Sequence, residues 1–190
     1  MKKTFFSLAM GALLSAGIST AASAQATMTH GTVMVGGAPM YPTKNIIENA
    51  VNSKDHTTLV AAVKAAGLVE TLQSAGPFTV FAPTNEAFNK LPAGTVETLV
   101  KPENKETLTK ILTYHVVAGR MTSADLKKAI KAGKGKATLK TVSGGTLTAM
   151  MKGPKTIELK DAKGGISTVT IADVMQSNGV IHVINTVLMP

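Results

Sequence analysis

The 190-residue chain contains no cysteine. Disulfide bonds, thiolate chemistry and a lipid attached through a cysteine are therefore excluded. A folded domain in this chain has to be stabilised by its hydrophobic core, and about 150 residues are enough to build one.

Arginine is almost absent as well. Lysine and arginine together number 20 against 11 acidic residues, which gives a formal charge of +9, yet Arg120 is the only arginine. Arginine is the residue that binds phosphates and base edges through two parallel hydrogen bonds. A basic chain built on lysine argues against specific nucleic-acid recognition. Weak attraction to acidic surfaces or polysaccharides stays open.

Catalytic signatures are missing too. The sequence holds neither a G-x-S-x-G nucleophile elbow nor an H-E-x-x-H zinc motif, and Gly-Lys-Gly-Lys at 133–136 lacks the spacing of a phosphate-binding loop. Only four histidines are present. We therefore expect no enzyme, no cofactor and no metal site, although folding could still assemble a triad from serine, histidine and aspartate.

A long apolar run occurs only at the start of the chain. Lys2 and Lys3 precede the mostly apolar stretch 5–18, and Ala-Ser-Ala at 22–24 fits a signal-peptidase site. This stretch is shorter than the roughly 18 apolar residues that a membrane-spanning helix needs. We expect residues 1–24 to be a signal peptide for export to the periplasm, the cell surface or beyond, with no transmembrane segment left after cleavage. Loss of its two lysines lowers the formal charge from +9 to +7.

Residues 25–42 contain several glycines and prolines and show no clear periodicity. This composition is typical of a flexible N-terminal arm. Thioether and imidazole groups suit Cu(I), and the arm carries Met28, His30, Met34 and Met40. No strict repeat organises these side chains, so we favour a disordered arm with oxidisable methionines over a copper site.

The segment Thr79–Phe88, with the sequence TVFAPTNEAF, predicts a strand that turns into a short helix. Pro83 ends the strand because proline has no N–H for a sheet ladder. Thr84 is then the expected helix N-cap. The residues that we expect to build this corner are Thr79, Phe81, Pro83, Thr84, Asn85 and Phe88.

A second segment begins with Asn178-Gly179, a strong signal for a tight turn. Residues 180–188 then alternate as a strand, with His182 on the same face as Val180. Both faces of this strand carry apolar residues, which indicates a position inside a layered structure and not at an open edge.

These two segments, with the dipeptide Tyr114-His115 between them, resemble the two conserved segments and the Tyr-His element of the fasciclin (FAS1) domain. The resemblance extends from about Lys44 to Pro190, so we expect one fasciclin domain over residues 43–190, of the short secreted bacterial type. It implies an α+β fold, a wedge-shaped β-sandwich with several short helices packed on it. It also implies a module for binding and adhesion.

The apolar spacing of the rest of the chain also predicts an α+β domain, because helices come first and antiparallel strands follow. Ser123 is the expected N-cap of the last helix, and Gly67 the expected C-cap of an earlier one. The predicted helices cover residues 44–52, 56–66, 68–73, 95–100, 103–113 and 123–131. The predicted strands cover residues 137–142, 146–151, 156–159 and 166–172, as two hairpins.

The resemblance also supplies candidate binding residues. Tyr114-His115 matches a region implicated in integrin binding in animal fasciclin proteins; the alternative is a core histidine bonded to the backbone with the tyrosine packed beside it. Asp173, Val174 and Met175 align with an Asp-Ile-Met stretch linked to integrin binding. Here valine replaces isoleucine, and Ile171-Ala172 replaces the usual Glu-Pro. This departure weakens the transfer of integrin specificity, and a loop or strand-end aspartate with local hydrogen bonds is the alternative.

Six lysines make the densest charge cluster, across an expected helix end and a glycine-containing loop. Such a cluster is commonly a solvated face. The functional alternative is a docking patch for an anionic glycan or lipopolysaccharide, with an affinity that falls as salt rises. The cluster consists of Lys127, Lys128, Lys131, Lys134, Lys136 and Lys140.

Composition and motifs predict an exported, non-catalytic protein, and the fasciclin resemblance implies a recognition module that mediates cell–cell, cell–matrix or host-surface contact. Its expected partner is a cell-surface protein or an anionic glycan, bound on a preformed protein face. The alternative is a periplasmic polysaccharide- or small-ligand-binding protein without an adhesive role.

Overall fold

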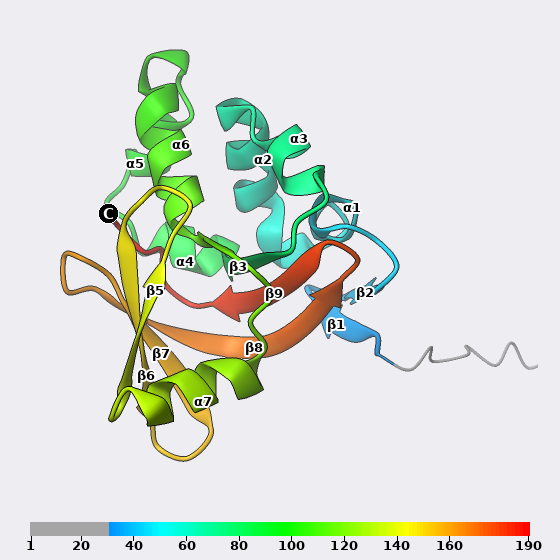
Figure 1. Cartoon of the computed structure of the whole chain (residues 1–190). Coiled ribbons are helices and arrows are strands. Elements are labelled where there is room, and N and C mark those ends of the chain that lie inside the picture. Colours follow the sequence, from blue (N-terminus) through cyan, green and yellow to red (C-terminus); the bar gives the residue numbers. More distant parts are fainter. Residues whose placement is uncertain (1–30) are drawn as a thin grey trace, which may run out of the picture.

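The computed structural model describes residues 31–190. A large curled sheet runs through the molecule, and most of the helices form a layer over one end of it (Figure 1). The expected signal peptide, residues 1–24, and the first part of the expected arm, residues 25–30 with Met28 and His30, lie outside the described residues.

The helices are short, and all of them precede the long strands in the chain. They are α1 (Ile46–Ala50), α2 (Thr57–Ala66), α3 (Val69–Gln73), α4 (Asn85–Asn89), α5 (Thr95–Leu99), α6 (Lys105–Tyr114) and α7 (Ser123–Ala132), with 3-10 turns at Lys54–His56 and Pro102–Asn104. Gly67 ends α2 in the left-handed conformation, with φ +73°, and Thr84 caps α4, both as predicted.

The strands fall into two sheets. They are β1 (Val33–Val35), β2 (Ala38–Met40), β3 (Phe78–Pro83), β4 (Val116–Ala118), β5 (Lys136–Lys140), β6 (Thr146–Lys152), β7 (Thr156–Lys160), β8 (Ile166–Gln176) and β9 (Gly179–Ile184). The strands β1 and β2 form a separate hairpin, and the other seven form one sheet in the order β4-β3-β9-β8-β7-β6-β5.

The seven-stranded sheet curls until its two ends approach each other. Only β3 and β9 run parallel; the other neighbours are antiparallel. A bridge between Val117 of β4 and Thr141, just after β5, and a hydrogen bond of 2.8 Å from Val142 N–H to the Val116 carbonyl join the ends. The result is an α+β fold with a nearly closed sheet, in agreement with the predicted class.

The parallel pair β3 and β9 separates two apolar cores. Val80 and Val183 face a core shared with α1, α2 and α6, whereas Phe81 and Ile184 face a core enclosed by the curled sheet and α7. Every residue of β9 is buried. This explains why the sequence is apolar on both faces of this strand. The strand ends at Ile184, four residues before the predicted end, and Val187 and Leu188 pack into the cores beyond it.

The prediction of a flexible arm is wrong for residues 33–40, which form the β1–β2 hairpin. Gly36 and Gly37 have positive φ and make its turn. Val35 and Met40 are buried in the core, at 4% and 2% exposure, whereas Met34 is 57% exposed. The glycines therefore mark a tight turn and not a flexible linker. Because Met40 belongs to the core, it is not available to a copper-binding arm.

Candidate functional site

Tyr114 is fully buried at the end of α6 and connects two turns of the sheet. Its hydroxyl donates to the carbonyl of Thr146 at 2.7 Å and accepts from the backbone N–H of Ala162 at 3.0 Å. Gly145 lies against the ring, because a Cβ at this position would come within 2.6 Å of it. The tyrosine thus fixes the β5–β6 and β7–β8 turns to the helical layer.

His115 follows and is also buried, at 2% exposure. Its Nδ1 donates to the carbonyl of Ile111 at 2.8 Å, and its Nε2 accepts from the N–H of Leu188 at 3.0 Å. Burial lowers the pKa of His115 to about 4, which keeps the ring neutral and able to accept this bond. This is the arrangement of a core histidine bonded to the backbone, and it leaves neither ring of the dipeptide exposed at the surface.

Asp173 lies at an irregularity of β8, with φ +58°, and points its carboxylate at the start of α7. The carboxylate accepts from the backbone N–H of Ser123 at 2.6 Å and from the Ser123 hydroxyl at 2.5 Å. Its charge is stabilised there by the N-terminal end of the helix dipole. Asp173 is half-buried, like Met175, whereas Val174 is buried at 1% exposure.

The prediction that Ser123 is the N-cap of α7 is wrong by one residue. The structure places Thr122 at the cap, where its Oγ1 accepts from Asp125 N–H at 3.3 Å and its own N–H donates to the Asp125 carboxylate at 2.9 Å. This reciprocal pair forms one residue earlier than predicted. Ser123 is then the first helical residue, and its N–H is satisfied by Asp173, fifty residues along the chain.

His182, on the central strand β9, connects Asp173 to the loop before α7. Its Nδ1 accepts from the N–H of Asp173 at 3.3 Å, so Nε2 carries the proton and donates to the carbonyl of Met121 at 2.8 Å. Burial lowers the pKa of His182. The ring also stacks on Phe81, its neighbour in the parallel register of β3 and β9, with 5.7 Å between the ring centroids.

The remaining residues of the two segments hold loops together. Asn178 accepts from Ile46 N–H at 3.1 Å and donates to two carbonyls near α3, whereas Asn85 bonds to the backbone of Lys54 and Thr58. Thr79 accepts from Met121 N–H at 2.9 Å. A Cβ at Gly179 would lie 2.2 Å from the Phe78 carbonyl oxygen, and Phe88 is buried in the helical core.

Within residues 31–190 no three histidine, aspartate or glutamate side chains gather at a place that could hold a metal ion. None of the helices in this range is long and apolar enough to cross a bilayer.

Comparison with protein families identifies the architecture. The fasciclin domain model matches residues 54–190, well over half of the chain. This chain belongs to the fasciclin family. The family is generally non-enzymatic, and the comparisons indicate no enzymatic family.

Bacterial and animal fasciclin proteins are similar to it in sequence. A Synechocystis protein is 45% identical over 176 residues, covering 92% of this chain and 89% of the relative. The immunogenic protein MPB70 of Mycobacterium bovis is 38% identical over 146 residues, covering 74% and 66%. The pig protein ig-h3, induced by transforming growth factor-beta, is 40% identical over 132 residues, which are 70% of this chain and 17% of that protein.

The fold agrees with a solved fasciclin structure. The FAS1 domain pair from the insect cell adhesion molecule Fasciclin I matches with a TM-score of 0.67 at 19% sequence identity, over 77% of this chain and 51% of that one. At this identity the likeness concerns the fold alone.

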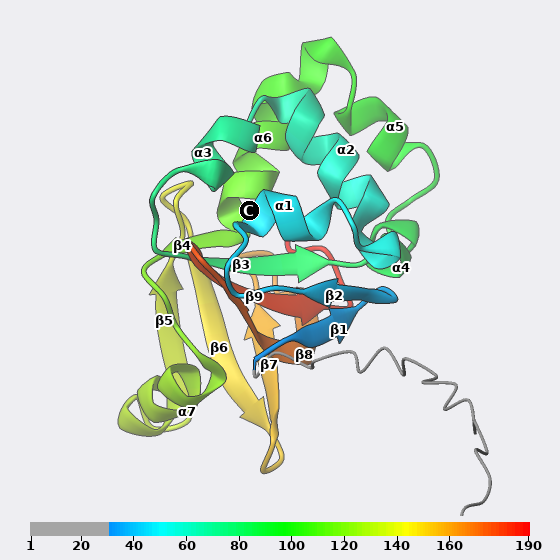
Figure 2. The same cartoon turned by 90° about the vertical axis from the view of Figure 1, so that its right-hand side faces the viewer.

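The lysine cluster is the predicted site that this fasciclin domain leaves open to solvent. Lys127 is half-buried and the other five lysines are exposed. Three of the six lie on α7, Lys134 lies in the following turn, and Lys136 and Lys140 point outward from β5, where Ala137 and Leu139 point into the core. The helix α7 lies at the opposite end of the sheet from α2 and α6 (Figures 1 and 2).

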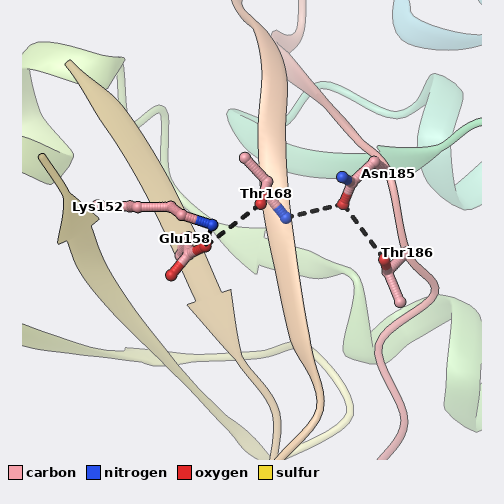
Figure 3. A network of polar contacts seen from close by, with 5 residues as sticks. All are labelled: Lys152, Glu158, Thr168, Asn185 and Thr186. Atoms are coloured by element: carbon pink, nitrogen blue, oxygen red, sulfur yellow. Dashed lines mark hydrogen bonds and ion pairs between the residues drawn. The ribbon is translucent and has the colours of Figure 1, made fainter.

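Next to this lysine cluster lies the outward face of β6, β7 and β8. This face was not predicted from the sequence. On it Lys152 forms an ion pair of 3.0 Å with Glu158, and Thr168 donates to the same carboxylate at 3.4 Å (Figure 3). Asn185 accepts from Thr168 N–H at 2.9 Å and from the Thr186 hydroxyl at 3.2 Å. The signal for this face was the alternation of threonine and lysine with buried residues along β6 and β7.

Proposed function

We propose that this fasciclin domain is an exported, non-catalytic adhesion module that attaches to anionic glycans of a cell surface or matrix. The exposed lysine cluster of α7 and β5 carries the proposal. Membership of the fasciclin family, whose domains are generally non-enzymatic adhesion domains, supports an adhesive role. The predicted signal peptide supports export, since a glycan of a surface or matrix lies outside the cytoplasm.

Charge favours a polyanion as the partner. Residues 122–140 hold six lysines and one acidic residue, Asp125. That carboxylate is engaged at the cap of α7, where bonds from Thr122 lower its pKa. In the part of the chain that the structure describes, none of the six lysines forms an ion pair, so their charges stay available to a ligand. Lysine ammonium groups bind flexible polyanions through summed, salt-sensitive attraction and without fixed geometry.

Burial argues against the integrin-type alternative. A receptor needs side chains that it can touch, yet Tyr114, His115 and Val174 are inside the cores. The carboxylate of Asp173 is taken by Ser123. Of the five candidate residues, this leaves Met175 for a receptor to contact, and Met175 is half-buried and uncharged.

The experiment measures binding of the mature protein to an immobilised anionic polysaccharide, with heparin as the probe, at low and at high salt. A variant with Lys128, Lys131, Lys134 and Lys136 changed to alanine should lose most of the binding. The matched control removes the same number of charges from the helical layer at the other end of the molecule, through alanine at Lys64, Lys101, Lys105 and Lys110, all exposed.

Equal losses in the two variants would indicate a response to net charge alone and would contradict a specific face. Binding that persists undiminished in molar salt would contradict electrostatic capture. Adhesion itself is tested by attachment of cells to coated protein, with the same two variants and with free heparin as competitor. Attachment that heparin does not reduce would contradict the glycan as partner.

A further inference from the structure

A small cavity lies between the helical layer and the central strands, next to the β1–β2 hairpin. Its volume is about 40 Å³, and its walls come from the hairpin, α1, α2, β3 and β9, with contributions from α6. Apolar side chains make almost the whole lining, among them Val35, Met40, Ile47, Leu59, Val63 and Ile181. The cavity is separate from the lysine face.

Three polar side chains, Ser53, His56 and His115, reach this lining. Both ring nitrogens of His115 are bonded to the backbone. The Nδ1 atom of His56 is bonded to the Ser53 hydroxyl at 2.9 Å. The Nε2 atom of His56 has no hydrogen-bond partner, although the residue is only 3% exposed.

A buried nitrogen without a partner needs an explanation, because leaving it unsatisfied is costly and native proteins rarely do so. The backbone of Ala82 acts on this ring as a weak hydrogen-bond partner and opposes the pKa decrease that burial causes in His56, but it does not reach Nε2 in the geometry of a full hydrogen bond. The ring is neutral, so one of its nitrogens is a donor and the other an acceptor.

Water is a poor partner at this place. The cavity exceeds the roughly 10–15 Å³ that one water molecule occupies, but a buried water needs two to four polar partners. Among the side chains of the lining, only His56 leaves a polar atom without a partner, and nearly all the rest of the surface is hydrocarbon. A molecule with an apolar body and a single hydroxyl satisfies both parts of the lining at once, and a hydroxyl can bond to either tautomer of the ring.

We propose that this cavity is a binding site for a small apolar alcohol, whose hydroxyl bonds to Nε2 of His56 and whose hydrocarbon part fills the space between the hairpin and α2. An apolar cavity of about 150 Å³ accommodates benzene. A ring-sized ligand therefore requires the wall to move outward.

We expect the β1–β2 hairpin to be the part of the wall that moves. Each of its strands has three residues, and two-stranded ribbons of this kind have little stability of their own. It is held by a bond of 3.2 Å from Lys54 N–H to the Gly36 carbonyl and by the pairing of Asn49 with the Tyr41 backbone. Figure 2 shows the hairpin at the edge of the helical layer, beside α1 and β8.

The test compares phenol with toluene, which has the same ring and nearly the same size but no hydroxyl. Both are titrated into the mature protein, and NMR follows the imidazole nitrogens of His56 and the methyl groups of Val35 and Met40. Phenol should bind about tenfold more tightly than toluene, as expected for one buried hydrogen bond. Phenol should change the chemical shift of Nε2 more than that of Nδ1. Both probes should change the chemical shifts of the methyl groups of Val35 and Met40.

Three variants locate the effect. His56→Leu should bring phenol down to the affinity of toluene. Ala82→Val, which adds two methyl groups at the lining, should weaken the binding of both phenol and toluene. Met34→Ala, on the same hairpin but 57% exposed and outside the lining, should change neither.

Equal affinities of phenol and toluene for the wild-type protein would overturn the proposal, and so would full discrimination retained in His56→Leu. Absence of binding by both probes would overturn it as well. If Ala82→Val does not fold, the comparison between the wild type and His56→Leu decides alone. Heparin binding is measured in parallel and should be unchanged in all three variants. The experiment therefore tests this proposal independently of the one for the lysine cluster.

Discussion

The Nε2 atom of His115 accepts a hydrogen bond from the N–H of Leu188, with 3.0 Å between the two nitrogens, and this bond fastens the end of the chain to α6. The next residue is held as well, because Met189 N–H donates to the carboxylate of Asp161 at 3.0 Å. Leu188 is fully buried in the core that the sheet and α7 enclose. The neutral form of His115 is therefore part of the folded structure.

Stability should accordingly fall in mild acid. The pKa of His115 is about 4 in the folded protein against 6.5 for an ordinary histidine, so between these values the unfolded chain binds the additional proton. The contribution is complete above pH 6.5 and is lost as the pH falls from 6.5 to about 4, by an amount on the order of 3 kcal/mol. His56 and His182, whose pKa values burial also lowers, add in the same direction. Urea unfolding at pH values from 7.5 to 4.5 measures this.

The variant His115→Gln separates this residue from the other two histidines. It should be less stable than the wild type at pH 7.5, because the glutamine amide does not reproduce both backbone bonds, and its stability should depend less steeply on pH. Equal slopes for the two proteins between pH 6.5 and 4.5 would contradict a neutral His115 as the main acid-sensitive group.

Asp173 is expected to act on stability and not on a receptor. In Asp173→Ala the N–H and hydroxyl of Ser123 lose their acceptor, and alanine is strained at φ +58°, so the free energy of unfolding should fall by about 1–3 kcal/mol. Asp173→Asn should lose less, because asparagine tolerates this conformation and still accepts a hydrogen bond. Thermal unfolding of the three proteins gives the order.

Cell attachment of the same proteins distinguishes the two roles of Asp173. Folded Asp173→Asn should attach cells as well as the wild type does at a temperature where both are native. A clear loss of attachment by this folded variant would instead support a receptor contact through the carboxylate, in the manner of the integrin-linked stretch that residues 173–175 resemble.

Local chemistry made part of this fold predictable. The corner at residues 79–88 follows from one proline and one capping threonine, and the inner strand β9 follows from its apolar residues on both faces. The β1–β2 hairpin was missed because it has only three residues on each side of a glycine pair, too few for a period-two pattern to stand out. Its burial depends on contact with β8, more than a hundred residues away.

The candidate site was predictable in residue type but not in role. The sequence shows an aspartate in a stretch that resembles an adhesion motif, yet it does not show that Ser123, fifty positions earlier, occupies this carboxylate. His56 begins an apolar helical stripe like many core histidines. Its free Nε2 emerges only when the hairpin, α2 and β3 are brought together around one cavity.

Glu158 should weaken polyanion binding by the lysine cluster and the adjoining outward face of β6 and β7. It is the one acidic residue among residues 136–160, and it neutralises Lys152 across β6 and β7. Glu158→Gln frees this lysine and should raise heparin affinity about two- to threefold at low salt, with the gain vanishing at high salt. Stability should change by less than about 1 kcal/mol, because glutamine keeps the shape of this 13% exposed side chain and an acceptor for the Thr168 hydroxyl, and the lost ion pair is with the 69% exposed Lys152. Unchanged affinity at low salt would place the glycan away from β6 and β7.

Asn178 should be the most sensitive position of the two conserved segments. Its Oδ1 accepts from Ile46 N–H at 3.1 Å, and its Nδ2 donates to the carbonyls of Leu72 and Ser74 at 2.7 and 3.0 Å. Asn178→Ala leaves these three backbone groups without their partner and should lower the free energy of unfolding by about 2–4 kcal/mol.

The variant Asn178→Asp tests whether the donor or the acceptor matters more. Aspartate keeps the acceptor for Ile46, but it turns a negative oxygen toward the carbonyls of Leu72 and Ser74, which need a donor. At pH 7 it should therefore be at least as unstable as the alanine variant. It should recover part of the loss near pH 4, where protonation of the carboxyl supplies one donor again. An aspartate variant as stable as the wild type at pH 7 would show that the acceptor bond to Ile46 alone holds α1 to the β8–β9 turn.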